Sequence, residues 1–216
     1  MRNPIKQKFR FYLLSLIAVV FSSSVWAHPH SWIDIKTQVI GKDKTVDGFK
    51  MEWTFDRMTT AYLLDGEDMS AQHRKQTLQS ISKSVIDNMV PSHYFTNLDA
   101  DKHSFDYQKV THSVLKVEKG KAILSFTLLL KKPYLFDGKD LYLRIFDPTY
   151  YVDMSWKSLS DFQFSKTMAA ECTSSLIKPH PTPAQVNRAM TIPMDANPDY
   201  QLGKVFTQAI KFSCGS

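Results

Sequence analysis

The sequence has little of what marks the common classes of enzyme. Its 216 residues include only two cysteines and seven glycines. We find no glycine-rich phosphate-binding loop, no nucleophile elbow and no zinc-hydrolase helix motif. With so few glycines, there are few places where the backbone could closely approach a cofactor. The sequence therefore gives no support for a nucleotide-dependent enzyme or a hydrolase of the familiar kinds.

Long apolar runs are also lacking. The longest, residues 11–21, follows four basic residues and is too short to span a bilayer, which takes about 20 residues. This pattern is typical of a secretory signal peptide, and the Val25-Trp26-Ala27 stretch indicates cleavage after Ala27. We expect an exported protein of the periplasm in which residues 28–216 form one domain that is not embedded in the membrane.

The positive charge is concentrated in the segment that we expect to be removed. The full chain has 27 basic and 21 acidic residues, a net charge of +6, and removal of the four basic residues of the signal lowers it to +2. No basic stripe follows later in the chain. The composition therefore gives no support for nucleic-acid binding.

The two cysteines predict a disulfide between Cys172 and Cys214, because an isolated pair in an oxidising compartment most often forms one. Two thiolate metal ligands are the alternative. It is disfavoured because neither cysteine has a second ligand at metal-site spacing.

The hydrophobic pattern predicts a single α+β domain with a mainly antiparallel, sandwich-like sheet. We expect a first hairpin from residues 30–40 and 45–55, then a helix with Leu78, Ile81, Val85 and Met89 on one face, ended by Pro91. Further strands are expected at 105–117, 122–130, 140–147 and near 161–170. After Cys172 we expect irregular chain and a final helix over 200–212.

The segment AHPHSWID, residues 27–34, carries the clearest chemical signal. On a strand, alternate side chains share a face, which would align His28, His30, Trp32 and Asp34. Imidazole and carboxylate groups are ligands that divalent Zn, Ni, Co and Cu accept. The segment therefore predicts a site for one transition metal ion, unless it is only the flexible start of the first strand.

Cleavage after Ala27 would add a ligand, because the α-amine of His28 can chelate a metal together with its own Nδ1. A copper site that uses deprotonated backbone amides and a third-position histidine is excluded, since Pro29 has no N–H to lose.

Four segments resemble one uncharacterised bacterial family: His28–Asp34, Trp53–Asp56, Phe126–Pro133 and Phe146–Met154. That family is described as the periplasmic component of an ABC-type transport system and is often encoded beside nickel/cobalt transporters. The resemblance implies an accessory that works with a membrane metal transporter or an ABC permease.

Further carboxylates could complete a metal site. Asp56 ends the second strand, and Asp147 and Asp153 flank a Pro-Thr-Tyr-Tyr turn. A cap or an Asx turn is the ordinary alternative for Asp56 and Asp147. The full predicted ligand set is His28, His30, Asp34, Asp56, Asp147 and Asp153.

Two other functions remain open from the sequence. One is a metal-free interaction module that docks on a membrane transporter. In that case His28 and His30 are only the residues that precede the first strand. The other, less favoured, is a copper-dependent oxidative enzyme; we predict that the protein is not an enzyme.

Overall fold

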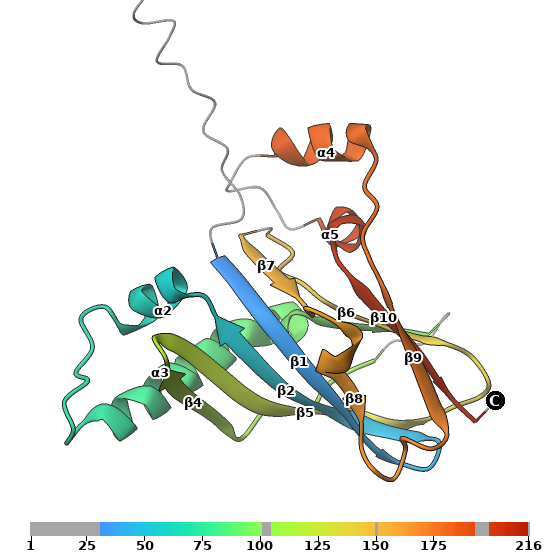
Figure 1. Cartoon of the computed structure of the whole chain (residues 1–216), viewed down its shortest axis with the longest axis horizontal. Helices are drawn as coiled ribbons and strands as arrows, with labels where there is room; N and C mark the ends of the chain where they lie inside the picture. Colours follow the sequence, from blue (N-terminus) through green and yellow to red (C-terminus); the bar gives the residue numbers. More distant parts are fainter. Residues whose placement is uncertain (1–30, 101–104, 150, 193–198, 216) are drawn as a thin grey trace, which may run out of the picture.

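The computed structural model describes residues 31–100, 105–149, 151–192 and 199–215. Within these ranges the chain forms ten β-strands in two sheets and four α-helices (Figure 1). The predicted α+β class is confirmed. His28, His30 and the predicted signal peptide lie outside the described residues. In the described part of the chain, no helix is long and apolar enough to cross a membrane.

The larger sheet is built around the predicted first hairpin, which is confirmed. Its order is β4-β5-β2-β1-β7, and β8 also pairs with β1; β7 and β8 run parallel to β1, and the other pairs are antiparallel. The six strands are β1 (Ser31–Lys42), β2 (Thr45–Phe55), β4 (Ser113–Glu118), β5 (Lys121–Leu135), β7 (Val152–Ser155) and β8 (Phe162–Phe164). Strand β1 is therefore hydrogen-bonded along both of its edges.

The smaller sheet is antiparallel, with the order β3-β6-β10-β9. Its strands are β3 (Thr96–Asp99), β6 (Leu141–Ile145), β9 (Cys172–Ile177) and β10 (Ala209–Cys214). The two sheets share one apolar core, in which the rings of Phe162 and Phe212 lie 5.4 Å apart. Trp53 and Leu141, one from each sheet, are almost fully buried.

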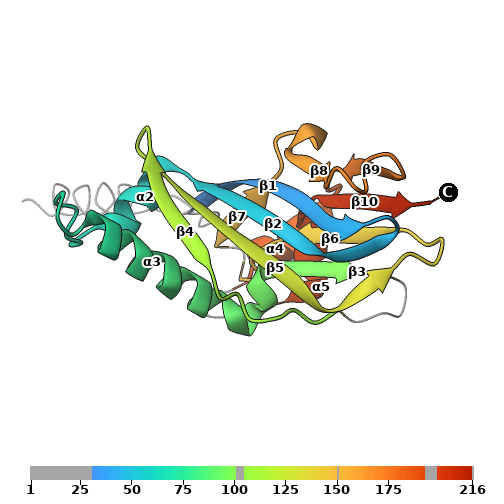
Figure 2. The same ribbon diagram turned by 90° about the horizontal axis from the view of Figure 1, so that it is seen from below.

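Four α-helices complete the described domain: α2 (Arg57–Leu64), α3 (Arg74–Met89), α4 (Pro183–Met190) and α5 (Tyr200–Phe206). Helix α3 confirms the predicted helix; it buries Leu78, Ile81 and Met89. Pro91 lies in the 3-10 segment that follows it. Figure 2 shows α3 running beside β4 at one end of the larger sheet, while the smaller sheet lies toward the other end.

Three sequence predictions were wrong. The predicted final helix ends at Phe206, and residues 209–214 form β10, because Ile210, Phe212 and Cys214 alternate inward and pair with β6 and β9. The chain after Cys172 is strand β9 rather than irregular. The predicted strand at 105–117 is regular only in β4, since residues 109–112 leave the ladder between the Tyr107 bridge and β4.

Strand β5 also continues beyond residue 130, where the predicted strand ended, and includes Pro133. Val46 pairs with Tyr134 and Gly48 with Leu129, so residues 130–133 bulge out of the ladder with β2. A proline is tolerated there because a bulge needs no ladder N–H. The same place on β2 requires glycine at position 48. The Cβ of any other residue would lie only 2.3 Å from the carbonyl oxygen of Leu128.

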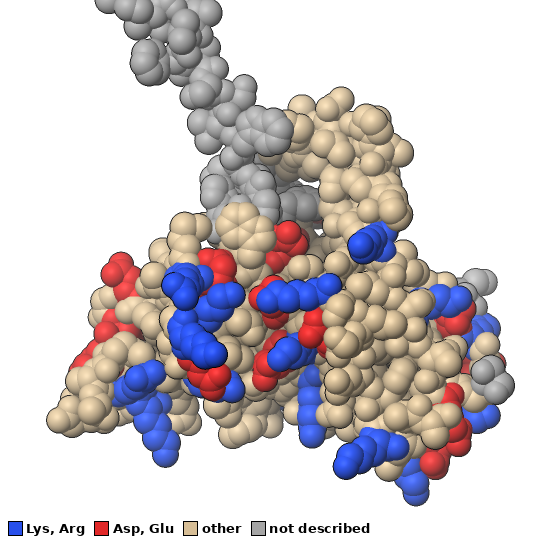
Figure 3. Space-filling view, viewed as in Figure 1, with Lys and Arg blue, Asp and Glu red and all other residues tan. Residues whose placement is uncertain are grey.

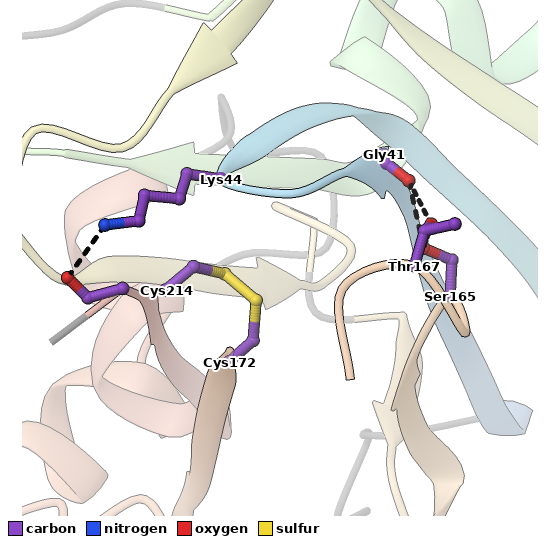
Figure 4. The surroundings of a disulfide bond; sticks show 7 residues. Gly41, Lys44, Ser165, Thr167, Cys172 and Cys214 are labelled. Atoms are coloured by element: carbon purple, nitrogen blue, oxygen red, sulfur yellow. Dashed lines mark hydrogen bonds between the residues drawn. A yellow bond between two sulfur atoms is a disulfide. The ribbon is translucent and has the colours of Figure 1, made fainter. Parts of the chain in front are cut away.

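The predicted disulfide is present. Cys172 and Cys214 face each other across β9 and β10, near the turn between β1 and β2 (Figure 4). Lys44 in that turn donates a hydrogen bond to the carbonyl oxygen of Gly215 at 3.3 Å. The hydroxyls of Ser165 and Thr167 donate to the carbonyl oxygen of Gly41. The disulfide thus fastens the C-terminal strand in the region where the two sheets meet.

We predict that replacing Cys172 and Cys214 with alanine lowers the free energy of unfolding by about 2–4 kcal/mol, because the unfolded chain loses a cross-link. Urea unfolding of the oxidised wild type and the double variant measures this difference. A reductant should shift the wild-type midpoint and leave the variant unchanged. Equal midpoints for the oxidised wild type and the variant would contradict the prediction.

Candidate functional site

The candidate site surrounds the start of β1, where Asp56 holds three elements together. The Asp56 carboxylate accepts hydrogen bonds from the Trp32 amide at 2.9 Å, from the Met58 amide at 2.7 Å and from the Thr59 amide at 3.0 Å. The Thr59 hydroxyl contacts both this carboxylate and the hydroxyl of Ser31. Asp56 is therefore the N-cap of α2 and also fixes the first residues of β1.

These hydrogen bonds change the acidity of Asp56. Burial alone would raise its pKa, but the hydrogen bonds from the Thr59 hydroxyl and from the amides of Trp32, Thr59 and Met58 favour the charged form. The net result is a pKa below the ordinary value. The Asp56 carboxylate is thus held ionised by donors of the protein itself.

Asp147 and Asp153 lie on the other side of β1. The buried Asp147 carboxylate accepts hydrogen bonds from the Thr149 amide at 2.9 Å, from the Thr149 hydroxyl and from the Val152 amide at 3.2 Å. Val152 is the parallel neighbour of Ser31 at the start of β1. Asp147 thus has the geometry of an Asx turn that leads into β7.

Asp153 differs from the other two carboxylates. It is the parallel neighbour of Trp32, it is exposed, and it forms no hydrogen bond or ion pair with the described residues. Partial desolvation raises its pKa. Its oxygens are therefore available to a ligand at the start of β1.

Asp34 lies two residues further along β1 and faces basic side chains. Its carboxylate is 2.7 Å from the Lys157 ammonium and 4.0 Å from that of Lys121. The hydrogen bond from Lys157 to Asp34 raises the pKa of the lysine. Basic and acidic side chains alternate over this part of the larger sheet (Figure 3). Asp34 thus takes part in surface ion pairs, whereas Asp56, Asp147 and Asp153 gather around the start of the strand.

The described residues alone do not assemble a metal centre. No three His, Cys, Asp or Glu side chains among them lie close enough together to hold a metal ion. The predicted site therefore depends on His28 and His30, outside the described residues, which come just before Ser31 in the chain. The structure brings to that point the side chain of Asp153 and the already bonded carboxylates of Asp56 and Asp147.

Sequence reasoning missed two features of this region. One is Thr59, whose hydroxyl links Asp56 to Ser31. The other is a group of exposed large side chains, which we call the apolar tip: Trp32 (47% exposed), Met58 (61%) and Tyr62 (83%). The backbone amides of Trp32 and Met58 both donate to the Asp56 carboxylate, which places the two residues near each other in the fold, and Tyr62 follows one helical turn after Met58. A helix over residues 57–64 was the signal that could have revealed the group.

We predict that Asp56→Ala lowers the free energy of unfolding by about 1–3 kcal/mol at neutral pH, because α2 loses its cap and the Trp32 amide its acceptor. Asp56→Asn should cost less, about 1 kcal/mol, since asparagine still caps helices. Urea unfolding measures both.

We also predict that the stability difference between the wild type and these variants depends on pH. Because the folded pKa of Asp56 is lowered, its charge stabilises the fold above the unfolded pKa of about 3.9, and this stability is lost as the pH falls through the folded pKa. The difference between wild type and Asp56→Asn should be complete at pH 7 and shrink below about pH 4. A difference that stays constant from pH 7 to about pH 2 would show that the charge has no role.

Comparison with known proteins gives a family but no function. A family model described as "Protein of unknown function (DUF1007)" matches residues 13–214. An uncharacterized protein of Haemophilus influenzae is 30% identical over 202 residues, which cover 92% of this chain and 97% of that protein. The match includes all four segments whose resemblance was noted in the sequence. The chain belongs to this family of unknown function.

Proposed function

We propose that this protein is an exported accessory of a membrane transport system and that it holds one divalent transition metal ion at the start of β1. Asp153 is the observation that carries the proposal. Asp153 is an exposed residue whose partly desolvated carboxylate lacks a partner among the described residues, and it neighbours Trp32, which follows His30 by two positions. His28, His30 and Asp153 together offer the imidazole and carboxylate donors that Zn, Ni, Co and Cu accept.

The remaining predicted carboxylates take different roles in this proposal. The Asp56 carboxylate positions the start of β1, and the Asp147 carboxylate positions the start of β7. Each carboxylate already accepts three or more hydrogen bonds from the protein. Asp34 is held by Lys157 and Lys121. The proposal therefore rests on Asp153 as the protein carboxylate that binds the ion directly.

The apolar tip supplies the surface for the transporter. Trp32, Met58 and Tyr62 are exposed beside the proposed metal site, and large exposed apolar side chains that gather in one place mark interaction surfaces. A transporter or permease that docks there would receive the ion, or deliver it, at the start of β1.

A metal titration of the protein processed after Ala27 tests the first part of the proposal, with Zn, Ni, Co and Cu compared by calorimetry. We expect tight binding of one ion, weakened at least about tenfold in His30→Ala and in Asp153→Asn. Asp34→Asn is the matched control and should bind like the wild type, because lysines already hold that carboxylate. One extra residue before His28 shows whether the α-amine is a ligand.

Equal affinity in the wild type, His30→Ala and Asp153→Asn would contradict this metal site. The apolar tip would then favour the second candidate function, a metal-free module that docks on a transporter. The two candidates therefore differ in the outcome of this one titration.

Docking has its own test. A photo-crosslinking amino acid at Tyr62 should capture a multi-spanning membrane transport protein in intact cells, whereas the same group at the exposed Lys166 should not. Capture that persists in His30→Ala would show that docking needs no metal. Equal labelling from both positions would argue against the apolar tip as an interface.

A further inference from the structure

A groove runs between α3 and the outer edge of β4, away from the proposed metal site. Its volume is about 1040 Å³. Leu78 and Ile86 of α3 contribute apolar side chains to it, and Val110 and Leu115 contribute from the other side. A hydrogen bond of 2.7 Å between the hydroxyls of Ser82 and Ser113 ties the helix to the strand. The groove thus has a helix on one side and the end of a sheet on the other.

Among the described residues, nothing pairs with the outer edge of β4. Strand β4 is the last strand of the larger sheet there and pairs with β5 alone. Lys119 and Gly120, both with positive φ, form the two-residue turn between these strands. The residues that flank such a turn, Glu118 and Lys121, form a hydrogen-bonded pair. Alternation then directs the backbone groups of Ser113, Leu115 and Val117 away from β5.

A second observation supports this alternation. Ala122, the residue opposite Val117, donates its amide hydrogen bond to the Thr60 hydroxyl at 2.9 Å instead of to β4. No hydrogen bond outside the β4–β5 ladder involves the backbone of Ser113, Leu115 or Val117 within the described part of the chain. Three backbone N–H groups and three carbonyls therefore point away from β5, and two of these residues, Ser113 and Leu115, line the groove.

The charge of the groove indicates what could occupy it. Lys75, Lys83 and Lys109 line it, and Asp87 is the acidic residue among its lining groups. Asp87 is already engaged by Lys83, and the hydrogen bond from Lys83 together with the charge of nearby Lys109 lowers the pKa of Asp87. Lys75 and Lys109 are exposed and add positive charge at opposite walls. An occupant that complements these groups carries acidic side chains.

We propose that this groove binds an extended, acidic segment of another protein, which adds to the free edge of β4 as a further strand. Main-chain hydrogen bonds to Ser113, Leu115 and Val117 would supply affinity, as in other cases of strand addition beside a helix. Alternate side chains of the segment would pack on the apolar residues of α3, and its carboxylates would meet Lys75 and Lys109. This site is independent of the proposed metal site.

The test uses a fluorescent peptide of about eight residues that alternates valine and glutamate. Fluorescence polarisation with the full exported protein measures its affinity. Two control peptides carry methyl groups on the backbone nitrogens of the valines or of the glutamates. Because only one set of nitrogens can face β4, one methylated peptide should bind at least about tenfold more weakly and the other should bind like the parent.

Protein variants test the charge. Lys75→Glu with Lys109→Glu should weaken binding at least about tenfold, whereas Lys166→Glu with Lys178→Glu, an equal charge change at exposed sites outside the groove, should not. Amide hydrogen exchange should show Ser113, Leu115 and Val117 unprotected in the free protein and protected by the peptide.

Three results would overturn the proposal. These are no binding of the parent peptide, equal binding of both methylated peptides, or equal weakening by the two pairs of charge variants. Protection of the same three amides that increases with protein concentration, without peptide, would assign the edge to a second copy of this chain.

Discussion

The Asp56 carboxylate is the interaction on which the start of the domain depends. It accepts the amide hydrogen bonds of Trp32, Met58 and Thr59 and so joins the end of β2, the beginning of α2 and the beginning of β1. The Asp56 amide in turn donates to the carbonyl oxygen of Trp32 at 3.0 Å. Since β7 pairs with the same first residues of β1, the place of Asp153 depends indirectly on Asp56. A capping interaction thus determines where a candidate ligand lies.

Local patterns made the first hairpin and the helix α3 predictable, although not the short helix α2 between them. The hairpin of β1 and β2 and the helix α3 each depend on neighbours close in the sequence, so period-two and helical spacing were sufficient signals. The C-terminal part depends on distant partners. Residues 200–212 carry apolar side chains that fit a helix, yet pairing with β6 and β9 makes 209–214 a strand. Only tertiary contacts decide between the two structures.

In the candidate site, too, some features follow from the local sequence and others only from contacts between distant residues. Asp56 and Asp147 could be named from the sequence because they stand at the end of a predicted strand and beside a predicted turn, where carboxylates have ordinary structural roles. The partners of Asp34 could not be found in that way, since Lys121 and Lys157 are remote in the chain and meet it only across the sheet. Asp153 could be named, but its lack of a partner among the described residues is a property of the folded surface. Sequence spacing therefore found the carboxylates, and the structure distinguished their roles.

The proposed metal site at the start of β1 and the groove beside β4 lie apart, but one side chain, Thr60, connects the elements that carry them. The Thr60 hydroxyl donates to the carbonyl oxygen of Asp56 at 2.7 Å and accepts from the amide of Ala122 at 2.9 Å. This side chain therefore connects the helix beside the start of β1 to the hairpin whose outer strand borders the groove. The two-residue turn at Lys119 and Gly120 places Val117 and Ala122 in a pair without ladder hydrogen bonds, so the Ala122 amide points away from β4 toward Thr60 and the backbone groups of Val117 face outward. The Thr60 side chain, next to the candidate metal site, thus also satisfies the inward-facing amide of the hairpin whose outer strand has the free backbone groups.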